Sequence, residues 1–323
     1  MLVACLLFLL GFILLIKGGD WFVDGATGIA HRFHLPELLI GATVVSIGTT
    51  LPEVMVSAQA ALQHNAGISY GNAIGSIICN TSLIAALTIT FAPGPVNKKS
   101  LRLPAAAFFI AAFIYSFVAY TSGQFTRLFG ICLLAMFAGY MFLSVRAMKN
   151  GDMADDEAED EEDRKEMTLA QELIFLVIGA AAIAVGANLL VENGTIIASA
   201  LGVPDSVIGL TMVALGTSLP ELVTAITSLM KGHGALSLGN VIGANLFNLV
   251  LVSGMAMTLS PFALPSEKML MGINSSLLID IPVMLGVMLL LCVPALTKGK
   301  LYRAQGIILL CIYAAFTIYQ FLI

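Results

Sequence analysis

Residues 48–53 read Gly-Thr-Thr-Leu-Pro-Glu, and residues 216–221 read Gly-Thr-Ser-Leu-Pro-Glu. The two copies belong to a longer repeat, because a shift of 168 residues places Ile40–Asn80 on Ile208–Asn248 without a gap. Fifteen of these 41 positions are identical, whereas chance would give roughly three for this composition. The chain therefore consists of two related halves, and the shared motif of each ends in a glutamate directly after a proline.

The composition places both halves in lipid. Of the 323 residues, 59% are hydrophobic and 11% are charged, whereas a soluble domain carries roughly 25% charged residues. Ten of the twenty acidic residues fall between Asp152 and Glu166. The rest of the chain has too few polar side chains to cover a globule in water, so its solvent must be lipid. This excludes a soluble enzyme, a nucleic-acid binder and a disordered scaffold.

Ten stretches are apolar and long enough to cross a bilayer as helices, which takes about 20 residues each. They lie near 2–29, 36–62, 67–91, 103–120, 126–148, 168–199, 205–230, 235–260, 278–296 and 303–322. Five spans per half is an odd number, so the second half must enter the membrane upside down. We expect an all-α membrane protein with ten transmembrane helices in two inverted five-helix repeats, residues 1–148 and 168–323. An acidic cytoplasmic linker, residues 149–167, joins them. Inverted repeats are typical of secondary transporters.

Basic residues orient the chain in the membrane. The predicted loops on one side hold Arg32, Lys98, Lys99, Arg102, Arg146, Lys149, Arg164, Lys165, Lys231, Lys298, Lys300 and Arg303, and those on the other hold only Arg127 and Lys268. Cytoplasmic loops are enriched in lysine and arginine, so both termini are predicted outside the cytoplasm. Lys17 lies within the first span, where local pairing with Asp20 and Asp24 accounts for its charge.

The repeated glutamates, Glu53 and Glu221, are the acidic residues deepest within the apolar stretches. A carboxylate at that depth is costly, and it indicates a functional site. Equivalent repeat positions would meet near the pseudo-twofold axis at mid-membrane. Because no lysine or arginine is predicted at that depth, the pair must hold protons or share a cation.

The motif prolines predict further oxygen ligands. Pro52 and Pro220 lack an N–H group and crowd the carbonyl four residues earlier, so we expect each helix to open, near 46–50 and 214–218. Freed carbonyls at membrane depth are tolerated where they line a cavity or bind something. Four hydroxyl groups lie in the same stretches, those of Thr49, Thr50, Thr217 and Ser218.

A second shared motif, Gly-Asn-x-Ile-Gly, occupies residues 71–75 and 239–243. Its glycines lie four residues apart, which allows helices to approach closely. After it come Ser76 and Asn80 in the first half, and Ala244 and Asn248 in the second. The amides of Asn80 and Asn248 would face the glutamates, and we expect the motif asparagines, Asn72 and Asn240, to bond helix backbone.

All these ligands are hard oxygen donors, which suit calcium or sodium rather than zinc or copper. The four histidines (His31, His34, His64 and His233) lie at predicted loops, so imidazole ligation is not expected. Two glutamates can neutralise one divalent ion, or hold several monovalent ions less completely. In an exchanger, the two kinds of ion compete for overlapping ligands, and this ligand set would allow such competition.

The paired motifs resemble the alpha repeats of the calcium/cation antiporter superfamily, particularly prokaryotic sodium/calcium exchangers, over essentially the whole chain. The resemblance implies that calcium is held by Glu53 and Glu221 together with the backbone around Thr49 and Thr217. It implies sodium ligands at Ser46, Thr50, Ser76, Ala214 and Ser218, and polar ligands at Asn80 and Asn248. Two positions depart from the family pattern. Ala244 stands where many members have serine, and Asn248 stands where some, including the potassium-dependent branch, have aspartate.

The function expected from this resemblance is exchange of sodium for calcium across a prokaryotic plasma membrane by alternating access. The first and sixth helices would slide over a rigid core. The alternative is a calcium/proton antiporter of the same fold, because a glutamate pair can also trade calcium for two protons. A passive cation channel is a weaker hypothesis. The expected partners are calcium and sodium ions and the lipid bilayer, with no cofactor, nucleic acid or obligate protein partner, and no enzymatic activity.

Overall fold

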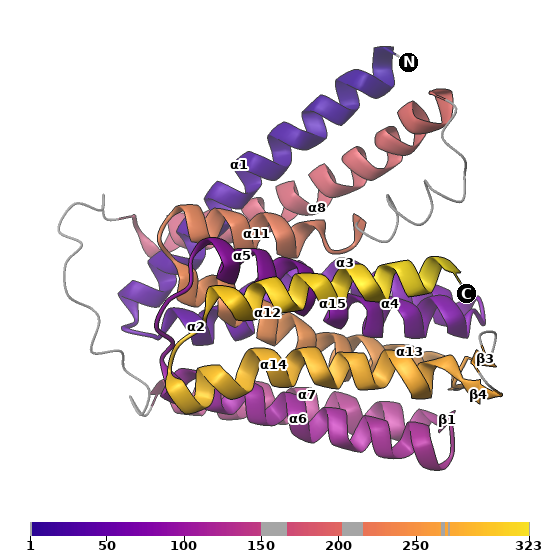
Figure 1. Cartoon of the computed structure of the whole chain (residues 1–323). Helices are drawn as coiled ribbons and strands as arrows, with labels where there is room; N and C mark the ends of the chain where they lie inside the picture. Colours follow the sequence, from indigo (N-terminus) through magenta and orange to yellow (C-terminus); the bar gives the residue numbers. More distant parts are fainter. Residues whose placement is uncertain (1, 150–166, 202–215, 266–268, 271, 323) are drawn as a thin grey trace.

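A computed structural model describes residues 2–149, 167–201, 216–265, 269–270 and 272–322, and its helices follow the predicted apolar stretches (Figure 1). The predicted acidic linker lies almost wholly outside the described residues. The elements of the first half are α1 (Leu2–Arg32), α2 (Glu37–Ile40), η1 (Gly41–Val45), α3 (Ser46–Leu62), α4 (Ala66–Cys79), η2 (Asn80–Ala85), α5 (Ala86–Phe91), α6 (Lys98–Thr121), β1 (Gln124–Phe125) and α7 (Arg127–Lys149). The letter η marks a π-helical turn.

The second half begins with α8 (Leu169–Ala200). It continues with α11 (Leu219–Met230), α12 (Gly234–Phe247), η4 (Asn248–Val252), α13 (Ser253–Leu259), β2 (Phe262–Ala263), β3 (Met269–Leu270), β4 (Ile273–Asn274), η5 (Ser276–Asp280), α14 (Ile281–Lys298) and α15 (Arg303–Leu322). Several labels form one continuous rod, as in Glu37–Leu62, Ala66–Phe91 and Gly234–Leu259.

Eight helices among the described residues are long and apolar enough to cross a membrane, and each coincides with a predicted span. Large apolar side chains on their outer faces, such as Leu6, Phe113 and Phe142, are exposed. An apolar surface of this extent fits a lipid environment. The span predicted at 205–230 is described only from residue 216 onward, as the short helix α11. The span predicted at 303–322 is the helix α15. The ten-span count and the inverted repeat remain predictions.

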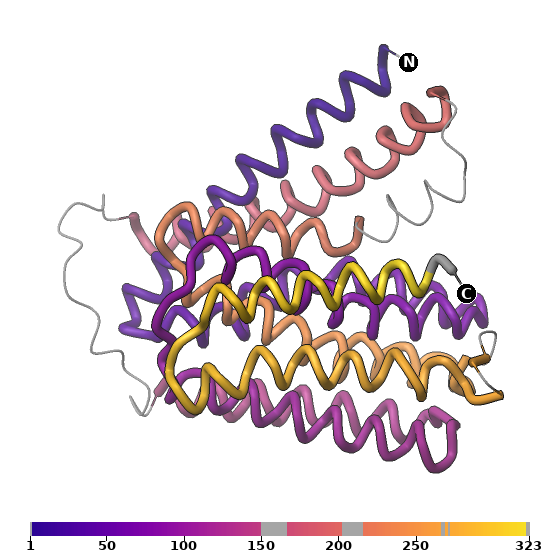
Figure 2. The backbone as a smooth tube through the Cα atoms, viewed as in Figure 1, coloured from indigo at the N-terminus to yellow at the C-terminus, as the bar shows by residue number. Residues whose placement is uncertain are grey.

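Helices α1 and α8 form a closely packed pair that leans away from the other helices (Figures 1 and 2). Glycines permit this contact. A Cβ atom on Gly18 would lie 2.9 Å from the backbone nitrogen of Ile183, and one on Gly186 would lie 2.8 Å from the carbonyl oxygen of Gly11. Since neither helix could carry a larger residue at these points without moving apart, the sequence builds the two helices into one paired unit.

The core of the remaining bundle centres on α12. Every residue of this helix from Leu236 to Phe247 is buried. Phe247 packs edge-on against Phe137 of α7, with ring centroids 5.0 Å apart. A helix that is buried on all sides needs no polar face, and this arrangement places the second shared motif in the middle of the molecule.

Two of the loops with predicted basic residues contact each other at one end of the bundle. There Pro95 pairs with Lys300, and Lys98 Nζ donates to the carbonyl oxygen of Thr297. At the other end β1 pairs with β2, with Gln124 opposite Ala263. Both chain termini lie toward that second end (Figure 1). The side of the membrane on which each end lies is still a prediction.

The charges within α1 pair more widely than expected. Lys17 lies 3.8 Å from Asp20, as predicted, but Lys231 also contacts both aspartates. Lys231 Nζ lies 2.8 Å from Asp24 Oδ1 and 3.5 Å from Asp20 Oδ1. Lys231 follows α11 in the second half, so this cluster links the paired unit to the rest of the bundle.

Candidate cation-binding site

Glu53 lies within α3, which runs unbroken through Pro52. The prediction that this helix opens at residues 46–50 is therefore wrong. The irregularity occurs one turn earlier, at the π-helical turn η1, and wide turns of this kind accommodate strain within a continuous helix. The first half therefore has a continuous helix, α3, where an opening lined by carbonyl groups was expected.

The second half follows the prediction more closely. Thr217 and Ser218 form a turn, and α11 begins at Leu219, so Pro220 occupies the first turn, where a missing N–H group has no cost. Glu221 lies in that same first turn, at the electropositive end of the helix. Ala214 lies outside the described residues.

The two glutamates are completely buried, and their oxygens are unpaired. Glu53 and Glu221 are each 0% exposed. None of their four carboxyl oxygens has a hydrogen-bond partner, and no lysine or arginine of the described chain forms an ion pair with them. The helices that carry them, α3 and α11, pack against each other. Buried unpaired carboxylates are strongly unfavourable, so these two carboxylates must hold protons or bind a cation.

Neutral oxygen donors without partners accompany the carboxylates. Thr50 on α3 and Ser218 before α11 occupy equivalent repeat positions, and the hydroxyl of each is buried and has no partner. Asn80 and Asn248 are each 0% exposed, with neither amide atom bonded. Buried polar groups normally have partners, so these unpartnered residues remain candidates for the predicted ligands.

Each of these asparagines begins a π-helical turn, Asn80 at η2 and Asn248 at η4. Such turns occur frequently at functional sites. Their occurrence at equivalent positions of both halves could not be foreseen from helix propensity, although the repeat located the asparagines themselves.

The remaining predicted ligands are more variably placed. Ser76 is buried, and Thr217 is half-buried. The hydroxyl of Thr49 is buried and donates to Asn240 Oδ1 at 3.1 Å. The hydroxyl of Ser46 donates to the carbonyl oxygen of Gly41 at 2.7 Å, and lies 3.0 Å from that of Asn240.

The two motif asparagines behave differently. Asn72 Nδ2 donates to the carbonyl oxygen of Glu53 at 3.1 Å and to Ser57 Oγ at 2.8 Å, so its predicted bond to helix backbone is confirmed. Asn240 instead accepts from a side chain of the opposite half, so the same prediction for it is wrong. Sequence reasoning thus missed a residue in direct contact with a predicted ligand.

The motif glycines of the second half act as predicted. A Cβ atom on Gly243 would lie 2.6 Å from the Cα atom of Ala42, and one on Gly239 would overlap the backbone of Leu38. These glycines let α12 lie directly against α2 and η1. In the first half, no described atom lies within 4 Å of a Cβ placed on Gly71 or Gly75. Their repeat-equivalent partner segment falls on residues outside the described ranges.

The site contains hard ligands. Among the described residues there is no group of three or more His, Cys, Asp or Glu side chains that could hold a metal. His233 Nδ1 lies 2.6 Å from Glu37 Oε1, and His64 Nδ1 lies 3.1 Å from Ser260 Oγ. Two carboxylates with hydroxyl and amide oxygens match the preferences of calcium and sodium.

A narrow crevice lies beside this ligand set. Its wall includes Phe22 of α1 and Ala180, Ile183 and Ala184 of α8 on one side, and Gly48, Thr49 and Pro52 of α3 with Pro220 of α11 on the other. The paired unit and the two motif segments that carry the glutamates thus meet at this crevice.

Comparison with known proteins identifies the family. The family described as "Sodium/calcium exchanger protein" matches residues 3–146 and 172–322. The chain belongs to this family. Its members exchange cations across membranes, so this exchanger is a multi-pass membrane transporter.

Relatives of this exchanger match it along nearly its whole length. Sodium/calcium exchanger MaX1 of Methanosarcina acetivorans is 32% identical over 98% of both chains. An uncharacterized membrane protein of Methanocaldococcus jannaschii is 38% identical, over 95% of this chain and 94% of that protein. The solved structure of the sodium-calcium exchanger NCX_Mj, soaked with sodium and strontium, superposes with a TM-score of 0.82, with 33% identity and 97% of each chain covered.

Proposed function

We propose that this exchanger is a secondary active antiporter that exchanges sodium for calcium across a prokaryotic plasma membrane. The observation that carries the proposal is the ligand set: two fully buried glutamates, Glu53 and Glu221, with four unpartnered carboxyl oxygens. One calcium ion would neutralise both charges, and sodium ions would use the same oxygens with neighbouring hydroxyls. Relatives named as sodium/calcium exchangers support the assignment of both ions.

In this proposal calcium is bound by Glu53, Glu221, Thr49 and Thr217. Sodium is bound by the glutamates with Thr50, Ser218, Ser76, Ser46 and the carbonyl oxygen of Ala214. Asn80 and Asn248 complete the ligand set. The unpartnered hydroxyls of Thr50 and Ser218, and the unpartnered amides of both asparagines, support this distribution.

Exclusive occupancy explains the coupling. Calcium and sodium would compete for the same two carboxylates, and an unoccupied site would leave two repelling charges in a low-dielectric environment. Movement of the unoccupied site is therefore unfavourable, and each ion crosses only in exchange for the other.

Alternating access would come from movement of the paired unit, α1 with α8, over the remaining bundle. The glycine-mediated contact between the two helices allows them to move together. The crevice between this unit and the motif segments lies next to Thr49 and Pro220, where a displacement of the unit would expose the ligands. We propose two inverted five-helix halves, residues 1–148 and 168–323, with the linker at 149–167 in the cytoplasm.

The test is calcium-45 uptake by reconstituted vesicles. Purified protein is incorporated into sodium-filled vesicles, which are diluted into sodium-free buffer with the proton gradient collapsed. The proposal predicts saturable calcium uptake that requires internal sodium. Uptake that appears only when a pH gradient is imposed would instead establish calcium/proton antiport. Uptake that needs no counter-ion and does not saturate would indicate a passive channel.

A further inference from the structure

Lys231 joins the two halves of the chain at one end of the bundle. It directly follows α11, and its side-chain nitrogen contacts α1. Lys231 Nζ donates to Asp24 Oδ1 at 2.8 Å and to the carbonyl oxygen of Asp20 at 3.1 Å, and it lies 3.5 Å from Asp20 Oδ1. An ammonium group has three donors, so α1 offers as many acceptors as Lys231 has N–H groups. We call these three residues the Lys231 cluster.

The two aspartates of the cluster lie on one face of α1. Asp20 and Asp24 are four residues apart, which makes them neighbours on the helix surface. Asp20 Oδ2 also lies 3.8 Å from Lys17, whose side chain is 61% exposed, whereas that of Lys231 is 26% exposed. Because exposed ion pairs are weakened by water, Lys231 is the main counter-charge of both aspartates.

The cluster lies where the paired unit packs directly against α11. A Cβ atom on Gly19 would lie 2.8 Å from Thr227 Oγ1 and 2.9 Å from Val223 Cγ1. Thr227 is one helical turn before Lys231, and the same helix carries Glu221 in its first turn. A movement of α1 away from α11 at this end would therefore separate Lys231 from both aspartates.

The other end of the paired unit lacks an equivalent cluster. The repeat places Gln63 at the position of Lys231. It places Asn188 and Glu192 at the positions of the two aspartates. All three residues are exposed, and no hydrogen bond or ion pair joins them in the described part of the chain. The N-terminal end of α1 leans away from the other helices (Figures 1 and 2), whereas its later turns, which carry the cluster, pack against α11.

We propose that the Lys231 cluster is an ionic lock, which holds the paired unit against α11 and favours the state in which the cation site is closed toward this end. The inference rests on the proposed function, since it requires that the paired unit moves during exchange. Opening toward this end breaks the contacts of one ammonium group and leaves the two aspartates with Lys17 alone. The equivalent positions at the other end carry no such contacts, so the lock biases the equilibrium between the two states.

The decisive experiment measures opening at this end and needs no transport. In a variant that folds without its five native cysteines, Thr227→Cys places a thiol at the contact with Gly19. A water-soluble maleimide should react with this thiol faster when α1 moves away. We expect Lys231→Met to raise the labelling rate about fivefold, the change in population that loss of a partly exposed ion pair produces. Lys231→Arg, which keeps the charge, should label at the parent rate. An unchanged rate in Lys231→Met would overturn the proposal.

The matched control is Lys99→Met, which removes an exposed lysine at the same end of the bundle. Its labelling rate should equal that of the parent, and an increase as large as in Lys231→Met would show a general effect of charge and overturn the lock. Asp24→Asn should increase labelling as Lys231→Met does, and it takes the place of Lys231→Met if that variant does not fold. The double variant Lys231→Asp with Asp24→Lys should recover part of the parent rate.

Transport gives a second readout that depends on the side of the membrane. The apparent affinity for an ion rises with the fraction of protein whose site is open to that ion, so Lys231→Met should lower the half-maximal calcium concentration about threefold on the side where Lys231 lies. It should not lower this concentration on the opposite side, whereas a general packing defect would impair both. If wild-type vesicles show no sodium-driven uptake, the proposed function fails, and the labelling rates alone decide the lock. If wild type exchanges and Lys231→Met matches it in both assays, only the present inference fails.

Discussion

Glu53 and Glu221 are the residues on which the site depends, because they supply its charge. Substitution of either by glutamine keeps the shape of the side chain but removes one negative charge. A single carboxylate cannot neutralise calcium, so we expect sodium-driven calcium uptake to fall to background in both variants. Calcium-45 uptake at matched protein density measures this. Glu192→Gln on α8, which removes an exposed acid, should transport like wild type. Uptake near the wild-type rate in Glu53→Gln or Glu221→Gln would contradict the site.

The unpartnered hydroxyls of Thr50 and Ser218 distinguish sodium from calcium. We expect Thr50→Val and Ser218→Ala each to raise the sodium concentration for half-maximal calcium efflux about fivefold, as the loss of one hydrogen-bond-strength ligand implies. The calcium dependence should change less, because calcium is bound mainly by the carboxylates. The measurement is sodium-dependent calcium efflux from loaded vesicles.

The control for these hydroxyl variants is Ser144→Ala on α7. Its hydroxyl is also buried and unpartnered, but α7 carries none of the proposed ligands. An equal loss of sodium affinity in Ser144→Ala would indicate a general packing effect and would contradict the proposed sodium ligands.

For individual residues, the internal repeat was the feature of the sequence that located the candidate ligands. An identical residue at one offset in both halves located Glu53 and Glu221, as well as Asn80 and Asn248. Asn240 was misread because its partner depends on an unrepeated position, where Ala225 stands in place of Ser57. A bond across 191 residues has no signature in local spacing, so it could be found only once α12 was placed against α3.

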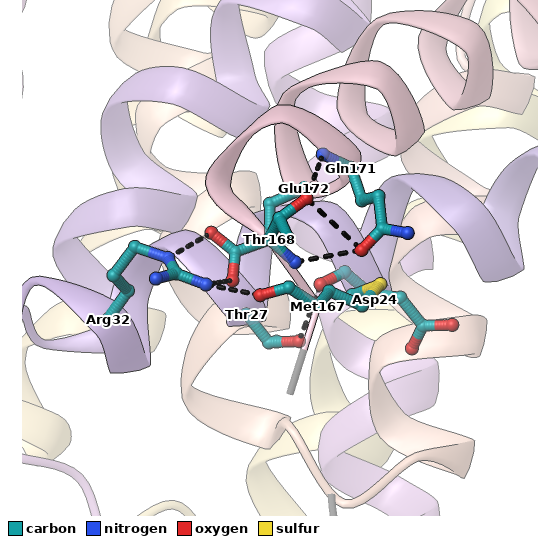
Figure 3. A network of polar contacts seen from close by, with 7 residues as sticks. All are labelled: Asp24, Thr27, Arg32, Met167, Thr168, Gln171 and Glu172. Atoms are coloured by element: carbon teal, nitrogen blue, oxygen red, sulfur yellow. Dashed lines mark hydrogen bonds and ion pairs between the residues drawn. The ribbon is translucent and has the colours of Figure 1, made fainter. Parts of the chain in front are cut away.

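Among the helices, α1 and α8 are joined by an ion pair at one end (Figure 3). Arg32 Nε lies 2.8 Å from Glu172 Oε2, and Arg32 Nη2 lies 2.9 Å from Glu172 Oε1. Arg32 also donates to the carbonyl oxygen of Met167, just before the capping box that Thr168 and Gln171 form at the start of α8. The end of α1 is thereby bonded to the beginning of α8.

Breaking this pair should loosen the paired unit. Arg32→Ala would leave the buried Glu172 carboxylate, 5% exposed, without its guanidinium, at a cost of about 1–3 kcal/mol. We expect a melting temperature several degrees lower and slower exchange, because the two helices would no longer move as one. Glu172→Gln should have a smaller effect in the same direction. The charge-reversed double variant Arg32→Glu with Glu172→Arg should recover part of the loss. No change in either measurement would show that glycine packing alone couples the helices.

Helix positions were predictable, but their internal irregularities were not. The bounds of α8, predicted at 168–199 and observed at Leu169–Ala200, follow from apolar length and the Thr168 cap. The opening expected before Pro52 was wrong, because α3 continues through this proline and the irregular turn, η1, lies upstream of it. The pattern of residues along the chain does not show how one helix packs against another, so the position of the π-helical turn could not be predicted.

For the whole molecule, the distribution of charge predicts orientation. The loops assigned to the cytoplasm hold twelve basic residues and the opposite loops hold two. In the described part of the chain, the loops that carry Lys98 and Lys300 contact each other at one end of the bundle, and β1 pairs with β2 at the other. If the chain inserts into the membrane with its lysine- and arginine-rich loops in the cytoplasm, both termini lie outside.

Cysteine labelling in intact cells tests this orientation. In a variant that transports but lacks the five native cysteines, Gln124→Cys should react with a membrane-impermeant maleimide added outside, because Gln124 is exposed in β1 at the predicted outer end. Lys99→Cys, exposed at the other end, should react only after the cells are permeabilised. The reverse labelling pattern would show that the orientation is opposite to the predicted one, and it would not contradict the proposed cation site. Labelling of both positions from outside would contradict the predicted passage of α6, which separates them, through the membrane.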